Sequence, residues 1–291
     1  MTRFPHDQFA KEYLKELLTP LGQVETSRNV AGEVREIDVL FTPSSTQTSA
    51  AQTLGLLGKI ATTPAIIEPF RNPVTANQIR SCMSKLFDIH ADIERQAKRE
   101  NTRLNEAELP KLWILSPTAS PLLLDSFGAS VDVENWVQGV YLLPENLKTA
   151  IVAIHQLPRT RETLWLRILG KGKVQTQAIN DLAELSQDNP LRGNALELLY
   201  NLRVTLEANQ SLDTEDRELI MELSPLYLER LDAALLEGQR IVVENLLRSR
   251  FGVIDEKLQS IVTPLLKLPP EEFTLLLLQL SRDELLARFS R

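Results

Sequence analysis

The first 172 residues alternate between stretches of helical and of strand-like hydrophobic spacing. Apolar residues recur every three or four positions over 7–18, which predicts an amphipathic helix with Asp7 at its N-cap. Short apolar runs that end near proline or glycine predict strands over 22–32, 35–43, 61–70, 111–120 and 139–145. Further helices are predicted over 53–60, 75–104, 122–128 and 146–156, whereas 162–169 is ambiguous between strand and helix.

After residue 172 the pattern contains helical spacing only. Helices are predicted over 175–186, 192–208, 213–249, 255–267 and 270–290. Because alternating strands and helices are typical of α/β domains, we expect an α/β domain over 1–172. An all-α C-terminal region is expected over 173–291.

The formal net charge of −7 lies in the second part of the chain. Residues 1–180 contain 20 Lys and Arg and 19 Asp and Glu, whereas residues 181–291 contain 12 and 20. DNA binding depends largely on phosphate neutralisation, so the acidic part argues against it and the near-neutral part leaves it open.

The cysteine and histidine content excludes several kinds of site. A single cysteine, Cys82, excludes a disulfide framework and any cysteine-based zinc site, and the three histidines lack metal-ligand spacing. No apolar run approaches the ~18 residues that span a bilayer. We therefore expect a cytoplasmic protein with no membrane partner.

Two acidic residues stand inside the most apolar predicted strands. Asp38 lies within the run 37–41, and Glu68 follows Ile66 and Ile67. Burial of a carboxylate is costly without compensation, and two such groups on neighbouring strands repel each other, so a divalent cation is one natural partner. Carboxylate oxygens suit Mg²⁺, which can promote phosphodiester cleavage. The alternative is that each acid faces solvent or pairs with a nearby arginine, Arg35 or Arg71.

The opening of the chain resembles a known nuclease family. Residues 5–14, PHDQFAKEYL, are similar to the PHDxxFKxxL opening of the recombination-promoting nuclease and transposase-like family, which belongs to the PD-(D/E)xK superfamily. The family's acidic strand motifs, roughly SDVLY and IExQSxP, correspond to IDVLF at 37–41 and IEPFRNP at 67–73. The resemblance covers about residues 5–95 and implies a restriction-endonuclease-like core, a mixed sheet flanked by helices.

This resemblance also implies an active site and a substrate. Asp38 and Glu68 would hold Mg²⁺ with Glu12 as a third acid, and the substrate would be DNA. The superfamily places Lys or Gln two residues after the second acid, where this chain has Phe70. Its replacement would come from Arg71 or from the following helix, where the candidates are Gln78, Arg80 and Lys85. Two functions follow: a Mg²⁺-dependent DNA endonuclease, or an inactive nuclease-fold protein that acts as an interaction or assembly module through its acidic tail.

The rest of the chain carries one further resemblance and two candidate interaction surfaces. Residues 235–291 contain the run LLRSRFG at 246–252, then Ile261, Leu265 and Leu266, then FTLL at 273–276. In these positions they resemble a small helical domain of unknown function that ends such proteins in cyanobacteria. Leucines and a valine at helical spacing between 228 and 246 predict an internal core or a homodimer seam of the C-terminal helices. The best candidate for a DNA contact is a basic region made of Arg159, Arg161, Lys171 and Lys173.

Overall fold

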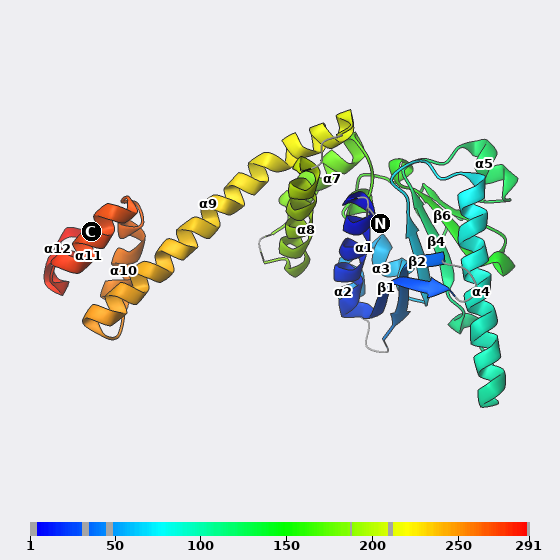
Figure 1. The fold of residues 1–291 in the computed structure, drawn as a ribbon, viewed down its shortest axis with the longest axis horizontal. Helices are drawn as coiled ribbons and strands as arrows, with labels where there is room; N and C mark the ends of the chain where they lie inside the picture. Colours follow the sequence, from blue (N-terminus) through cyan, green and yellow to red (C-terminus); the bar gives the residue numbers. More distant parts are fainter. Residues whose placement is uncertain (1–4, 31–34, 45–48, 187, 209–211, 290–291) are drawn as a thin grey trace. The chain divides into compact units, whose positions relative to one another are not determined.

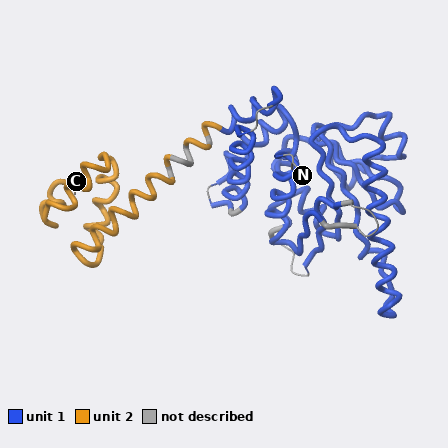
Figure 2. The backbone as a smooth tube through the Cα atoms, viewed as in Figure 1, with its two compact units in different colours: residues 1–223 blue, residues 224–291 orange. Residues whose placement is uncertain are grey.

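The computed structural model describes residues 5–30, 35–44, 49–186, 188–208 and 212–289. The chain divides into two compact units, Met1–Leu223 and Ser224–Arg291 (Figure 2).

The first unit is built on a six-stranded mixed sheet (Figure 1). Its strands are β1 (Gly22–Val30), β2 (Arg35–Pro43), β3 (Ala65–Pro69), β4 (Lys111–Ser116), β5 (Val140–Leu142) and β6 (Thr149–Ala153). The strand order is β1-β2-β3-β4-β6-β5. Strands β3, β4 and β6 run parallel, whereas β1, β2 and β5 each pair antiparallel with a neighbour. A mixed sheet with flanking helices, followed by helices, confirms the coarse fold class that the sequence predicts.

Helices cover both faces of this sheet. The helices of this unit include α1 (Pro5–Leu18), α2 (Ser49–Thr53), α3 (Leu56–Ile60), α4 (Ala76–Glu100), α5 (Pro121–Ser126), α6 (Leu164–Arg167), α7 (Lys173–Ala183) and α8 (Pro190–Glu207). Short 3-10 turns cover Thr19–Leu21, Glu106–Glu108, Glu145–Leu147 and Ile154–Gln156.

The main core lies between the sheet and α4 with α5. Strand residues such as Ile66, Leu112 and Ile151 pack there against Ile79 and Leu86 of α4. The opposite face is covered by α1, which contacts β1, β2 and β3, and α8 packs against α1 in turn (Figure 1).

The helix predicted over 146–156 is wrong, because β6 occupies its centre. Residues 149–153 are all buried and pair parallel with β4 and antiparallel with β5. A short continuous apolar run does not distinguish a buried strand from a buried helix, and long-range pairing decided between them. The ambiguous stretch 162–169 contains the short helix α6.

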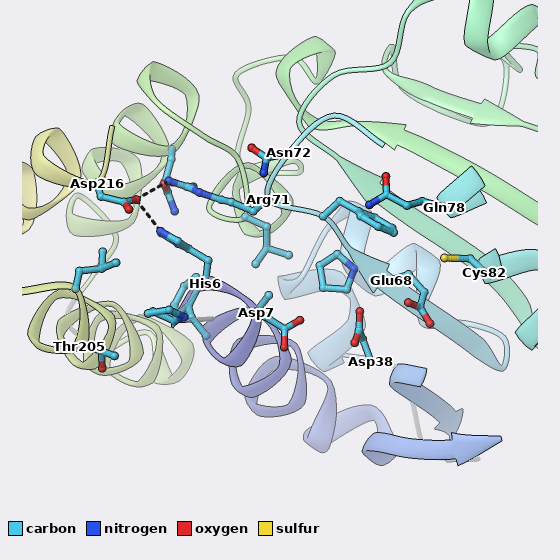
Figure 3. Close-up of a pocket in the computed structure, with 18 of the residues that line it drawn as sticks. His6, Asp7, Asp38, Glu68, Arg71, Asn72, Gln78, Cys82, Thr205 and Asp216 are labelled. Atoms are coloured by element: carbon cyan, nitrogen blue, oxygen red, sulfur yellow. Dashed lines mark hydrogen bonds and ion pairs between the residues drawn. The ribbon is translucent and has the colours of Figure 1, made fainter. Parts of the chain in front are cut away.

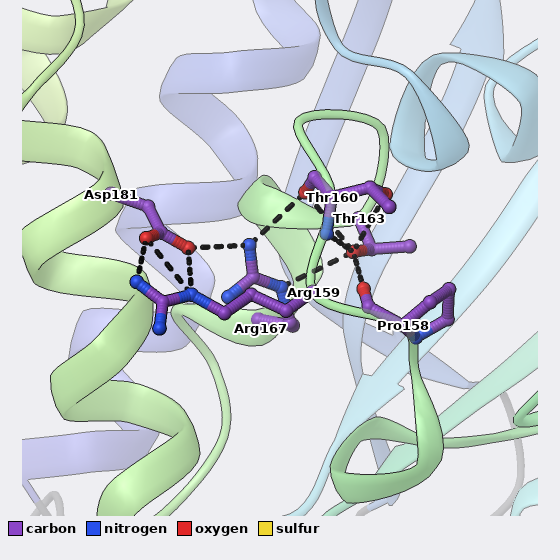
Figure 4. A network of polar contacts seen from close by, with 6 residues as sticks. All are labelled: Pro158, Arg159, Thr160, Thr163, Arg167 and Asp181. Carbon is purple, nitrogen blue, oxygen red and sulfur yellow. Dashed lines mark hydrogen bonds and ion pairs between the residues drawn. The ribbon is translucent and has the colours of Figure 1, made fainter.

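The last strand does not mark the end of the first compact unit. The sequence places the boundary between residues 172 and 173, whereas the first unit continues to Leu223 and includes α7 and α8. Helix α7 is attached by an arginine network (Figure 4). The buried Arg167 donates to Thr160 O over 3.0 Å and to Asp181 Oδ2 over 2.9 Å, and Arg159 approaches the same carboxylate.

The second unit is helical. It contains most of α9 (Thr214–Phe251), followed by α10 (Glu256–Leu265), α11 (Pro270–Gln279) and α12 (Arg282–Phe289). Its core includes Val243 and Leu247 of α9. The single helix predicted over 270–290 is divided because Ser281 caps α12: Ser281 N donates to Glu284 Oε2 over 2.8 Å, and Glu284 N donates to Ser281 Oγ over 3.4 Å.

The helical stripe of α9 does not lie entirely in this core. Leu228, Leu235 and Val242 are at least half exposed, whereas Leu246 packs against the core. The side chain of Leu231 lies outside the described residues. Among the described helices, none is both long and apolar enough to cross a membrane.

Candidate functional site

The two predicted acids come from adjacent antiparallel strands. Val39 pairs with Ile67 and Leu40 with Ile66, so the same register places Asp38 opposite Glu68. Because side chains alternate along a strand, these two carboxyls project from the same face of the sheet. Directly opposed residues have Cβ atoms about 5 Å apart, which brings two like charges together.

Both carboxyls line one cavity of about 1080 Å³ in the first unit. Its walls come from the start of α1, the β3–α4 connection, α4 and the end of α8. Figure 3 shows Asp38 and Glu68 in the same part of this cavity, with Asp7 beside Asp38. The paired acids therefore meet at a shared cavity.

Helix α4 supplies the cation that faces Glu68. The helix begins with a capping box, in which Thr75 N donates to Gln78 Oε1 over 2.9 Å and Gln78 N donates to Thr75 Oγ1 over 3.3 Å. Two turns later Lys85 Nζ donates to Glu68 Oε1 and Oε2 over 2.7 and 2.8 Å, and to Glu36 O over 2.8 Å. Glu68 is only 2% exposed, so Lys85 is the charge that balances it.

Helix α1 supplies a second cation, which faces Asp38. Lys11 Nζ lies 2.9 Å from Asp38 Oδ1, 3.1 Å from Asp7 Oδ2 and 3.6 Å from Glu36 Oε1. Asp7 and Lys11 lie one helical turn apart, in the same stripe of α1 as the buried Leu14. The opening of α1 therefore contributes a charged cluster to the site.

Burial dominates the proton affinities of the two acids. Desolvation and the negative charge of Asp38 raise the pKa of Glu68 to about 7, although the Lys85 ammonium opposes this shift. Desolvation also raises the pKa of Asp38, against the ion pair with Lys11. Burial, followed by the charge of Glu68, raises the pKa of the Cys82 thiol to about 12, so this cysteine is a neutral neighbour of the acids.

Two of the candidate site residues, Glu12 and Arg80, are not part of this acidic cluster. Glu12 is exposed, accepts a hydrogen bond from Gln8, and is not among the residues that line the cavity. Glu12 lies outside the α1 stripe that reaches the cavity, so the structure does not bring it together with Asp38 and Glu68. Arg80 is exposed and contacts Asn77. Phe70 lines the cavity and packs against the core between sheet and α4.

Arg71 belongs to a different cluster at the other end of the cavity (Figure 3). It donates to Gly170 O and Gln175 Oε1, both over 3.0 Å, and to Asp216 Oδ1 over 3.3 Å. His6 Nε2 lies 2.7 Å from the same Asp216 oxygen. Arg71 thus pairs with Asp216 and not with Glu68. The side chain of Arg35, the other arginine considered for pairing, lies outside the described residues.

Much of the predicted basic region is neutralised within the first unit. Arg159 pairs with Asp181, and Lys171 pairs with Glu215 and more distantly with Asp213. Partnered cations contribute less to a phosphate-binding surface.

Asp38 and Glu68 can supply only part of the coordination shell of a hard divalent cation. Among the described residues, no group of three or more His, Cys, Asp and Glu side chains is placed to hold a metal ion. Mg²⁺ commonly takes one or two carboxylates and completes its shell with water and substrate phosphate. Two opposed carboxyls at a cavity, one buried and one half-buried, meet that smaller requirement.

The sequence did not single out Lys11 or Asp7 as site residues. Helical spacing carried a usable signal, since Asp7, Lys11, Leu14 and Leu18 form one stripe of α1 and Glu12 lies outside it. Comparisons with protein-family models, curated proteins and solved structures gave no match to this chain.

Proposed function

We propose that this protein is a Mg²⁺-dependent DNA endonuclease, or a close derivative of one, with a restriction-endonuclease-like core. The observation that supports it most is the direct opposition of Asp38 and Glu68 on adjacent strands, facing one cavity together with Lys85. The identification of DNA as the substrate rests on the resemblance of residues 5–95 to the nuclease family.

The roles of the side chains follow from their contacts. Asp38 and Glu68 would hold the cation, which when bound supplies Lewis-acid activation of a phosphoryl oxygen and of water. Lys85 approaches both oxygens of Glu68 and so fixes the orientation of that carboxylate. As a cation from α4 it would take the place of the missing Lys or Gln at Phe70. Asp7 is the acid of α1 that lines the cavity, in place of Glu12.

The alternative is an inactive nuclease-fold protein that acts as an interaction module. One observation favours it: Lys11 and Lys85 already balance the two carboxylates without a metal ion. The exposed leucines of α9 would then belong to the interaction surface.

Cleavage of supercoiled plasmid DNA in Mg²⁺ or Mn²⁺ separates the two functions. The wild-type chain should nick or linearise the plasmid, and Asp38→Ala should lose at least about 100-fold in rate, equivalent to about 3 kcal/mol of transition-state stabilisation. Asp88→Asn is the matched control, because Asp88 is an exposed acid on α4. It should cleave at the wild-type rate.

Two results would contradict the proposal. Cleavage that is undiminished in Asp38→Ala would place the activity elsewhere or in a contaminant. Failure of the wild-type chain to cleave with either metal, while it remains folded, would favour the interaction module.

A further inference from the structure

The ammonium group of Lys11 contacts more carboxylates than its single positive charge can neutralise. Lys11 Nζ lies within 3.6 Å of three carboxylates, those of Asp38, Asp7 and Glu36. Its side chain is only 12% exposed. A single positive charge therefore faces three carboxylates, of which Asp38 is the one opposite Glu68.

The two lysines of the site differ in how firmly they are held. Lys85 makes short contacts to both oxygens of Glu68 and to the carbonyl oxygen of Glu36. Lys11 spreads its contacts over three separate side chains, two of which, Asp7 and Glu36, are more exposed than Asp38. Lys11 can therefore lose its contact with Asp38 and still keep two carboxylate partners. The hydrogen bonds of Lys85 named above reach a single carboxylate, that of Glu68.

We infer that the Lys11 ammonium ion is an internal counter-ion that a divalent cation must displace from Asp38 in order to bind there. The inference rests on the proposed function, since it concerns the same metal site. It assigns Lys11 a positioning role: it stabilises the metal-free site and weakens metal affinity. The displaced ammonium would remain beside Asp7 and Glu36.

Repulsion between the Lys11 ammonium and a divalent cation should be measurable as a lower metal affinity. An ammonium ion within hydrogen-bonding distance of a metal ligand opposes the cation, and it also competes for the ligand's oxygen. Removing that charge should tighten metal binding. If Lys11 only ties α1 to β2, its removal should leave metal affinity unchanged or lower it.

Mn²⁺ binding to the full-length chain without nucleic acid tests the inference. Free Mn²⁺ is measured by electron paramagnetic resonance, and the dissociation constant is checked by calorimetry. Lys11→Met should bind Mn²⁺ at least about tenfold more tightly than the wild type, a change of about 1.4 kcal/mol. Lys11→Arg keeps the charge and should stay near the wild-type affinity. Lys15→Met is the matched control, because Lys15 is an exposed lysine on the same helix.

Loss of Lys11 leaves Asp38 without its counter-ion, so folding must be followed as well. Far-UV circular dichroism checks that each variant is folded, and Lys11→Gln is a second variant that keeps a hydrogen-bond donor. Added Mn²⁺ should raise the melting temperature of both neutral variants more than that of the wild type. The double variant Lys11→Met/Asp38→Asn should lose the gain in affinity.

The outcomes separate the inference from the proposed function. If the wild type binds Mn²⁺ and neither Lys11→Met nor Lys11→Gln binds it more tightly, the counter-ion role is overturned. The metal site itself is then left intact. A gain that survives Asp38→Asn also overturns it, since the metal would then bind elsewhere. Absence of Mn²⁺ binding in every variant overturns both the inference and a metal-dependent reaction.

Discussion

Lys85 donates hydrogen bonds to both carboxylate oxygens of Glu68, over 2.7 and 2.8 Å, from a helix that begins eight residues after that acid. The pair is buried, with Glu68 2% and Lys85 9% exposed. Such a pair contributes little net stability when intact, but removal of one partner leaves an uncompensated buried charge.

Lys85→Met should therefore lower the free energy of unfolding by about 3–5 kcal/mol at pH 8. The loss should be smaller at pH 6, because a proton on Glu68 then replaces the missing cation. Urea unfolding at the two pH values measures both effects. Lys85→Arg, which keeps the charge, is the control and should lose less. Equal losses at pH 6 and pH 8 would contradict an ionised Glu68 as the cause.

The raised pKa of Glu68 predicts a pH dependence of stability in the wild-type chain. The pKa rises from the usual 4.5 to about 7 on folding, so the folded state holds this proton more tightly than the unfolded state. The stabilising contribution is complete below pH 4.5 and is lost as the pH rises to about 7, by about 3 kcal/mol at most. Glu68→Gln cannot titrate, so its unfolding free energy relative to the wild type should increase over this range. A constant difference from pH 5 to pH 8 would show that Glu68 does not titrate there.

Arg71 and Asp216 should act as a structural pair and not as part of the metal site. Arg71→Gln and Asp216→Asn should each lower stability, and a double-mutant cycle should give a coupling energy of about 1 kcal/mol. Arg71→Gln should leave the Mn²⁺ affinity unchanged, because its guanidinium contacts Gly170, Gln175 and Asp216 and none of the site acids. A large loss of Mn²⁺ affinity in Arg71→Gln would contradict this separation.

Asp181 accepts contacts from two arginines whose exposure differs greatly (Figure 4). The side chain of Arg167 is 3% exposed and that of Arg159 is 56% exposed. Arg167→Met should cost about 3 kcal/mol, because it leaves Asp181 and buried polar groups without their donor. Arg159→Met should leave stability nearly unchanged, since exposed ion pairs contribute little. Thermal unfolding of the two variants under the same conditions makes the comparison, and equal losses would contradict it.

Local patterns in the sequence were sufficient to predict most helices and strands of the fold. The boundaries predicted for 35–43 agree with β2, and the helices of α1 and α4 lie where their hydrophobic stripes predict them. The failure at β6 has a physical cause: its run of buried residues carries no period, and only pairing with β4 and β5 made it a strand.

The sequence by itself determined that Asp38 and Glu68 would be acids within apolar strands. Only the tertiary structure decided that the two acids oppose each other, because strand register depends on pairing between segments far apart in the chain. It also decided which cations meet them. Lys85 and Lys11 reach the site from two helices on opposite faces of the sheet, and no spacing along the chain encodes where those helices pack.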